Sequence, residues 1–135
     1  MAKKMKLAMC KVTPVKNHRL ECTVIERRGR YDYELQPVKT SSVQWVFRVS
    51  DDVYLVETRH TLYVVKDQTI PGNTKFVDMY EETPRVGDKF SCFDLTDQNK
   101  EYRKVYRTST IKSIEFISEE VCEVKTQNSV YYCYF

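Results

Sequence analysis

The chain has 135 residues, of which 41% are hydrophobic, and a formal net charge of +3. This length fits one ordinary domain or two very small ones, and the hydrophobic content excludes wholesale disorder. No apolar run approaches the roughly 20 residues of a membrane helix, and the basic N-terminal segment has too short an apolar stretch for a secretion signal, so we expect a cytoplasmic protein. The mild positive charge argues against an acidic DNA mimic and permits an anionic ligand.

The residue types favour strands. The chain contains 10 Tyr and 6 Phe, and Val, Ile and Thr crowd into short segments separated by turn residues. Apolar residues do not recur at helical spacing over any long stretch, so we predict an all-β fold.

Five cysteines without a CxxC pair fit neither a disulfide framework nor a zinc site, and we expect no metal or other cofactor. We predict that the cysteines are small core side chains, at Cys10, Cys22, Cys92, Cys122 and Cys133.

The expected strands form two similar series along the chain. The first series comprises residues 6–12, 20–26 and 31–35, followed by a three-stranded meander at 43–49, 53–58 and 62–65. A Thr-Pro pair ends its first strand, because proline lacks the backbone donor that a central strand needs. The second series comprises residues 76–82, 89–95 and 101–106, followed by a meander at 111–117, 121–126 and 130–133.

These two series are copies of one unit. Residues 40–63 lie over 108–131 without a gap, so that Thr40 meets Thr108 and Tyr63 meets Tyr131. Residues 9–22 lie over 79–92 when two residues are dropped from the turn at residues 27–30. We therefore predict an internal duplication of a small barrel-like unit of SH3 size, with repeats at 1–66 and 67–135 packed with pseudo-twofold symmetry. Two separate barrels and one merged β domain both fit this pattern.

The copies differ on one face of the meander. Copy one places large apolar residues there, where copy two has polar ones. The matched positions are Trp45 and Ser113, Phe47 and Glu115, and Leu55 and Glu123. We expect copy two to be solvated on this face. The apolar face of copy one packs against the other copy or the N-terminal segment, forms a subunit interface, or serves as a ligand platform on which Trp45 stacks. The turn residues Arg59 and His60 belong to the same candidate partner surface.

Basic and aromatic residues cluster at one place in each copy. Arginine forks bind phosphate oxygens in pairs and tyrosine rings stack on bases, so each cluster is a candidate anion site. A charged strand edge that prevents aggregation is the alternative, and nearby acidic residues dilute the positive charge. The candidate residues are Arg27, Arg28, Arg30 and Tyr31 in copy one, with Tyr33 beside them, and Arg103, Tyr106 and Arg107 in copy two. We find no nucleophile and base at a recognised spacing, so we expect a non-enzymatic protein.

The repeated pattern at Thr40–Tyr63 and Thr108–Tyr131, TS-x-[VI] followed by T-x-[NH]-[ST]-x-Y, resembles a module in short uncharacterised proteins of Gram-positive bacteria and their phages. The resemblance implies a small accessory protein of a phage or mobile element. Such a protein would bind and inhibit a host defence component or sequester a cyclic or other anionic nucleotide, and it would form a homo-oligomer if its apolar face is a subunit interface. A tandem-barrel protein that binds single-stranded nucleic acid and a structural or virion accessory protein are the alternatives.

Overall fold

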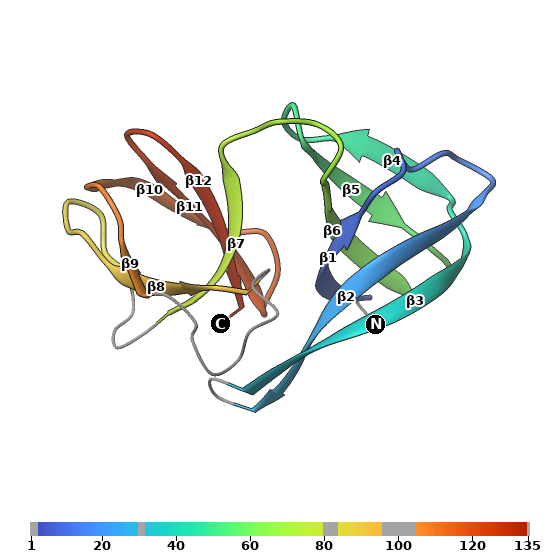
Figure 1. Cartoon of the computed structure of the whole chain (residues 1–135), viewed down its shortest axis with the longest axis horizontal. Coiled ribbons are helices and arrows are strands. Elements are labelled where there is room, and N and C mark those ends of the chain that lie inside the picture. The colour runs from blue at the N-terminus through green and yellow to red at the C-terminus, as the bar shows by residue number, and fades with distance from the viewer. Residues whose placement is uncertain (1–2, 30–31, 80–83, 96–104, 135) are drawn as a thin grey trace. The chain divides into compact units, whose positions relative to one another are not determined.

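The computed structural model describes residues 3–29, 32–79, 84–95 and 105–134. In these ranges the chain forms twelve strands in two six-stranded sheets, which confirms the all-β prediction (Figure 1). Two compact units follow one another, and the first ends at Gly72 while the main part of the second begins at Asn73. None of the described residues belongs to a helix that is long and apolar enough to cross a membrane.

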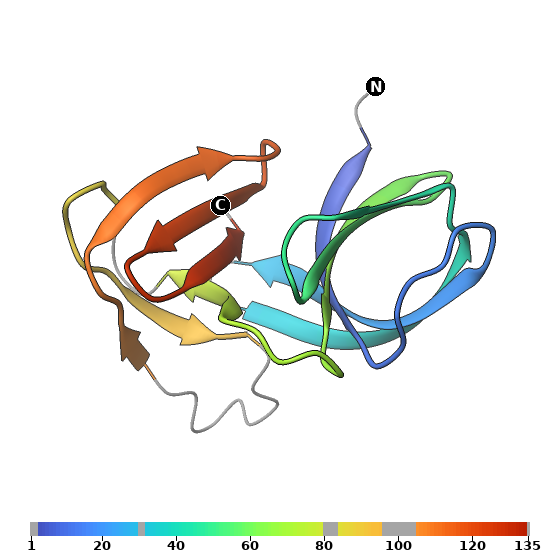
Figure 2. The ribbon, with the colours of Figure 1, turned by 90° about the horizontal axis from the view of Figure 1, so that it is seen from above.

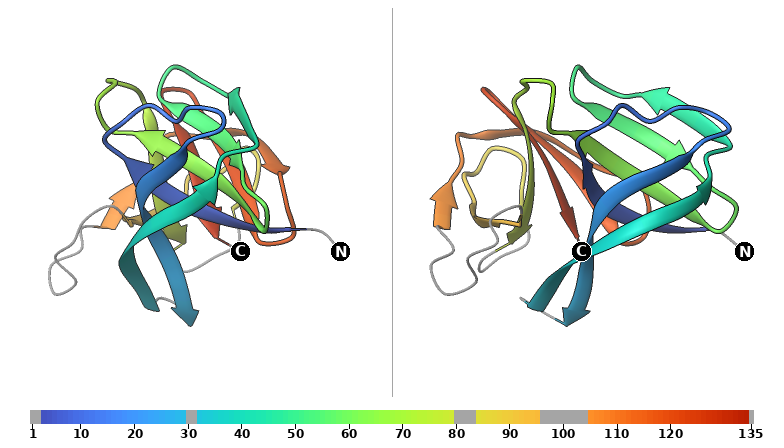
Figure 3. Two further views of the ribbon diagram at one scale, coloured as in Figure 1. Left: turned by 90° about the vertical axis from the view of Figure 1, so that its right-hand side faces the viewer. Right: turned by 45° about the vertical axis from the view of Figure 1, so that its right-hand side comes forward.

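Unit 1 is one curved sheet with the strand order β3-β2-β1-β6-β5-β4. Its strands are β1 (Lys4–Cys10), β2 (Arg19–Gly29), β3 (Asp32–Ser42), β4 (Trp45–Arg48), β5 (Val53–Glu57) and β6 (Thr61–Asp67). The central strands β1 and β6 are parallel, while β1–β2, β4–β5 and β5–β6 are antiparallel. The hairpin of β2 and β3 is the longest in the unit and extends beyond the other strands (Figure 3).

Unit 2 repeats this topology. Its strands are β7 (Thr74–Met79), β8 (Ser91–Asp94), β9 (Val105–Arg107), β10 (Ile111–Phe116), β11 (Val121–Thr126) and β12 (Val130–Tyr134). They are ordered β9-β8-β7-β12-β11-β10, which is the order of unit 1 strand for strand. The central pair, β7 and β12, is again parallel. Two units with the same uncommon central pairing are what an internal duplication predicts.

Matching hydrogen bonds extend the repeat to the turns. The Asn17 N–H donates to the Val43 carbonyl at 2.8 Å, and the Gly87 N–H donates to the Ile111 carbonyl at 2.9 Å. Both donors have a positive φ, 70° for Asn17 and 93° for Gly87. Asparagine and glycine tolerate this left-handed conformation better than other residues. The same turn is therefore built in both units by residues that suit it.

Each sheet curls around its own core (Figure 2). In unit 1 the inner face carries Ala8, Cys10, Leu20, Cys22, Val24, Val43, Tyr54, Val56, Tyr63 and Val65. In unit 2 it carries Val77, Phe90, Cys92, Ile111, Cys122, Val124, Tyr131 and Cys133. Val46 and Ile114 pack against the edges of these cores, as the alternation of the meander predicted. All five cysteines are buried with free thiols, which confirms their assignment as core side chains.

The predicted alignment of the first strands is wrong by one residue. Ala8 lies opposite Val24 in unit 1, while Val77 lies opposite Asp94 in unit 2. Because Val24 and Asp94 are equivalent, Ala8 matches Val77, and Met9 does not match Met79. The turn residues keep the predicted spacing, so the difference arises between the end of the first strand and that turn. A one-residue slip in a strand exchanges its two faces, and the core position therefore identifies the correct match.

Candidate interaction surface

An exposed apolar strip lies along the edge of unit 1. It consists of Trp45, Phe47 and Val49, whose side chains are 63%, 67% and 43% exposed. Trp45 and Phe47 are alternate residues of β4, and Val49 follows the strand directly, so the three side chains lie on one face. The Lys16 ammonium lies 4.4 Å from the centre of the Trp45 ring. The two aromatic residues of this strip were predicted from the sequence as part of a partner surface, and Val49 was not.

The strip belongs to an edge strand. In the strand order of unit 1, β4 is last and its ladder partner is β5. The Val49 N–H donates to the Val53 carbonyl at 2.9 Å, so Val49 and Val53 form a hydrogen-bonded pair. At steps of two residues along the same register, Phe47 lies opposite Leu55 and Trp45 lies opposite Glu57. Hydrogen bonds alternate along an antiparallel pair. The main-chain groups of Val46 and Arg48 therefore point away from β5, toward an edge with which no other described strand pairs, called the open edge below.

The neighbouring strand supplies the rest of the predicted surface. Leu55 lies directly opposite Phe47 but is only half-exposed. Glu57, opposite Trp45, forms an ion pair with Lys3 at 3.3 Å. Arg59 and His60 are exposed in the turn that follows β5. The structure thus brings Trp45, Phe47 and Leu55 together on adjacent strands and places the two turn residues at the end of β5.

Unit 2 differs from unit 1 at these positions only partly as predicted. Ser113 and Glu115 are exposed, as expected for a solvated face. The prediction is wrong for Glu123, which is 8% exposed. The Tyr132 hydroxyl, on the residue directly opposite in β12, donates to the Glu123 carboxylate at 2.7 Å. This hydrogen bond and an ion pair with Lys125 at 3.4 Å compensate for the loss of water around the buried carboxylate.

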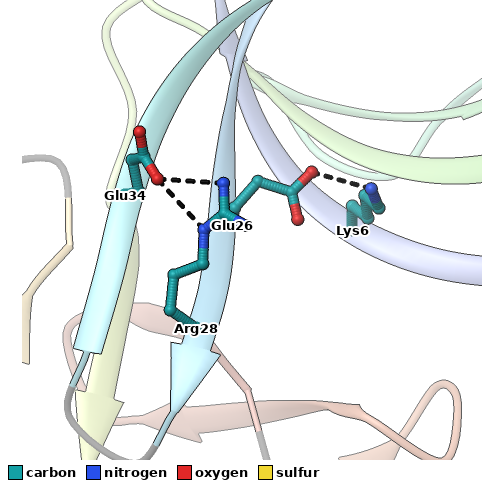
Figure 4. A network of polar contacts seen from close by, with 4 residues as sticks. All are labelled: Lys6, Glu26, Arg28 and Glu34. Carbon is teal, nitrogen blue, oxygen red and sulfur yellow. Dashed lines mark hydrogen bonds and ion pairs between the residues drawn. The ribbon is translucent and has the colours of Figure 1, made fainter.

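The basic cluster of copy one is partly neutralised. The Arg28 guanidinium forms an ion pair with Glu34 at 2.9 Å and donates to it from Nε at 3.0 Å (Figure 4). Beside this pair, the Lys6 ammonium contacts Glu26 at 2.7 Å (Figure 4). Tyr33 is 1% exposed, so its ring offers no face to a base. Arg27 is exposed, while Arg30 and Tyr31 lie outside the described residues.

The basic cluster of copy two is divided between two faces. Tyr106 and Arg107 are consecutive residues of β9, so their side chains point to opposite sides of the sheet. Tyr106 lies opposite the core residue Cys92, and the Lys75 ammonium lies 5.2 Å from its ring centre. Arg107 is exposed on the other face, and Arg103 lies outside the described residues. Tyr106 and Arg107 therefore do not converge on one ligand.

Four of the five cysteines have raised pKa values and are poor candidates for chemistry, while a hydrogen bond with Cys133 lowers the pKa of the buried Cys122. Burial raises the pKa of Cys10 and of Cys22 to about 11, and that of Cys92 to about 12. A hydrogen bond to Cys122, together with burial, raises the pKa of Cys133. Because the thiolate is the reactive form, such thiols are inert at neutral pH. No group of three or more His, Cys, Asp or Glu residues in the described part of the chain could hold a metal ion.

No family model, curated protein or solved structure matches this chain.

Proposed function

We propose that this protein is a non-enzymatic binding protein that acts by occupying a partner protein, with the apolar strip as its contact surface. The observation that supports this most is the difference between the units. Unit 2 forms the same β-hairpin with Ser113 and Glu115 in place of Trp45 and Phe47. The fold therefore does not need two aromatic side chains at these positions, and their exposure is better explained by recognition.

The chemistry of the strip suits a protein partner. Tryptophan and phenylalanine are enriched in the buried centres of protein interfaces, and arginine is enriched with them. Here Trp45 and Phe47 form an apolar centre, and the Lys16 ammonium lies over the Trp45 ring. A nucleotide is less well served, because Arg28 pairs with Glu34 and the described tyrosines of the basic clusters are buried or face away from the nearby arginine.

The partner class follows from the resemblance of the repeated module to short proteins of phages and Gram-positive bacteria. We propose that the partner is a component of a host defence system and that binding blocks it. In this role a small accessory protein needs no catalysis, only a surface that competes with the partner's own contacts.

The test is a plaque assay in cells that carry individual defence systems, with this chain supplied from a plasmid. The chain should restore plating of a restricted phage on at least one host. The double variant Trp45→Ser and Phe47→Glu, which gives β4 the residues of unit 2, should lose the rescue. Val86→Ser removes an exposed apolar side chain from unit 2 and should retain it. Absence of rescue on every host would overturn the defence target, and rescue by the double variant would overturn the strip as contact surface.

A further inference from the structure

We propose that the chain forms a homodimer in which β4 pairs antiparallel with β4 of a second copy, with the twofold axis at Phe47. The inference rests on the hydrogen-bonding pattern of the edge and on the side chains that this pattern brings together. Self-association of this kind needs no partner protein. The dimer would be the state of the free protein, and a partner protein would compete for the same strip.

The main-chain pattern of β4 is self-complementary. Thr58 N–H donates to the Thr61 carbonyl at 2.9 Å, so the even-numbered residues of β5 bond to β6 and the odd-numbered ones bond to β4. Val46 and Arg48 then present their main-chain groups at the open edge. When two copies of β4 meet with Phe47 opposite Phe47, Val46 of each copy lies opposite Arg48 of the other. Each such pair exchanges both main-chain hydrogen bonds.

The side chains fit the same register. Phe47 lies opposite Phe47 of the second copy at a non-hydrogen-bonded position, where opposing side chains approach closest. Trp45 lies opposite Val49 of the second copy on the same face. The three exposed apolar side chains of one strip therefore cover those of the other, and no other slip of the strands pairs all of them. Aromatic pairs and aromatic–β-branched pairs are among the favourable cross-strand pairs.

The pairing does not bury an uncompensated charge. On the opposite face of β4, the Arg48 guanidinium donates from Nε to the Ser50 carbonyl at 3.2 Å and from Nη2 to the Asp51 carbonyl at 3.1 Å. It also lies 3.9 Å from the Asp51 carboxylate. These contacts are within its own hairpin, so Arg48 keeps them when the strand edge is covered.

The equivalent edge of unit 2 shows why the pairing is specific to β4. The Ile117 N–H donates to the Val121 carbonyl at 3.0 Å. By the same alternation, the main-chain groups of Ile114 and Phe116 point away from β11, as those of Val46 and Arg48 point away from β5. The residue at the twofold axis would be Glu115. Like charges directly opposite one another destabilise a strand pair, and inward or edge charges prevent sheets from joining. Phe116, the exposed apolar residue of β10, lies on the other face.

Sedimentation equilibrium of the purified full chain tests the dimer, at concentrations from about 1 μM to about 1 mM. The mass should rise from 16.1 kDa toward twice that value. Phe47→Glu should raise the dissociation constant of the dimer roughly tenfold or more, because it replaces the pair of aromatic rings by two negative charges directly opposite each other. Arg48→Pro should also prevent dimerisation, because it removes an edge N–H that does not bond to β5. Val86→Ser should leave the dimer unchanged, and circular dichroism should show that each variant is folded.

Amide hydrogen exchange gives an independent reading. The Val46 and Arg48 amides should exchange more slowly at high protein concentration than at low concentration, while those of Ile114 and Phe116 should not change. A monomer over the whole range would overturn the inference, and so would a dimer that survives both variants. Neither result would change the conclusion from the plaque assay, because that assay reports on binding to a partner and not on self-association.

Discussion

The hydroxyl of Thr40 ties the start of β2 to the end of β3. It accepts a hydrogen bond from the Leu20 N–H at 2.9 Å and donates one to the Ser41 carbonyl at 2.7 Å. In unit 2 the Thr108 hydroxyl accepts from the Phe90 N–H at 3.1 Å. Both threonines are 4% exposed, so water cannot replace these bonds. The substitution Thr40→Val keeps the shape of the side chain and removes both hydrogen bonds.

The expected loss of stability follows from the buried donor. An N–H left without an acceptor in the protein interior costs about 1–3 kcal/mol. We expect Thr40→Val to lower the free energy of unfolding by about 2 kcal/mol. Thr108→Val should lower the free energy of unfolding by about 1–2 kcal/mol. The Thr108 hydroxyl accepts the equivalent hydrogen bond, from the Phe90 N–H, and that bond is longer than the one to Thr40. The conservative change Thr40→Ser keeps the hydroxyl and should recover most of the loss.

Urea denaturation measures the effect. Circular dichroism follows both sheets, while the fluorescence of Trp45, the single tryptophan, reports on unit 1. Thr40→Val should therefore shift the fluorescence midpoint at least as far as the circular dichroism midpoint. If Thr40→Val falls within about 0.5 kcal/mol of the wild type, or if Thr40→Ser is as unstable as Thr40→Val, the hydroxyl is not what holds these strands together.

Three further predictions concern Asp67, the five cysteines and Gly87. Hydrogen bonds from the Thr69 hydroxyl and N–H and from the Thr13 hydroxyl outweigh the effect of burial and lower the pKa of Asp67. The ionised Asp67 carboxylate thus stabilises the fold above the pKa that it has in the unfolded chain, and this contribution is lost as the pH falls through its lower pKa in the folded protein. The urea midpoints of wild type and Asp67→Asn should differ most near pH 7 and converge below about pH 4. All five thiols should resist a disulfide reagent at pH 8 in the native protein and react at once in urea; rapid native labelling would contradict their burial. Gly87→Ala should cost about 1–2 kcal/mol in thermal unfolding because of its positive φ, while Gly87→Asn, which copies the equivalent Asn17, should cost less; equal losses would refute this explanation.

The sequence predicted the meanders well because their signals are local. β5 was expected at residues 53–58 and is Val53–Glu57, and β11 was expected at 121–126 and is Val121–Thr126. Alternating apolar residues and acidic turn residues mark both. β3 was expected to end at residue 35, but it continues to Ser42 through Pro37. Since β3 lies at the sheet edge, a proline that lacks an N–H does not break it.

Features that depend on strand pairing were beyond the sequence. No local sequence pattern indicates that β1 pairs in parallel with β6, because the two strands lie far apart along the chain. The burial of Glu123 follows from the same cause: its compensating partner, Tyr132, is opposite it only once the register of β11 and β12 is known. The candidate anion sites depend on the same information, because neighbouring residues in a strand, such as Tyr106 and Arg107, face opposite ways. Arg30, Tyr31 and Arg103 lie outside the described residues, so these sites stay predictions.

The apolar strip and the open edge of β4 act best as one surface. Covering what is exposed of Trp45 and Phe47 would contribute about 2–4 kcal/mol, given about 1.5–3 kcal/mol for complete burial of one such side chain. A micromolar complex requires about 8 kcal/mol after the cost of association, so the two rings alone do not hold a partner. Main-chain hydrogen bonds at Val46 and Arg48 supply a second contribution along the same strand. Arg48→Pro leaves both rings in place and should therefore weaken every complex made through the strip, and an unchanged affinity would show that the rings act without the edge.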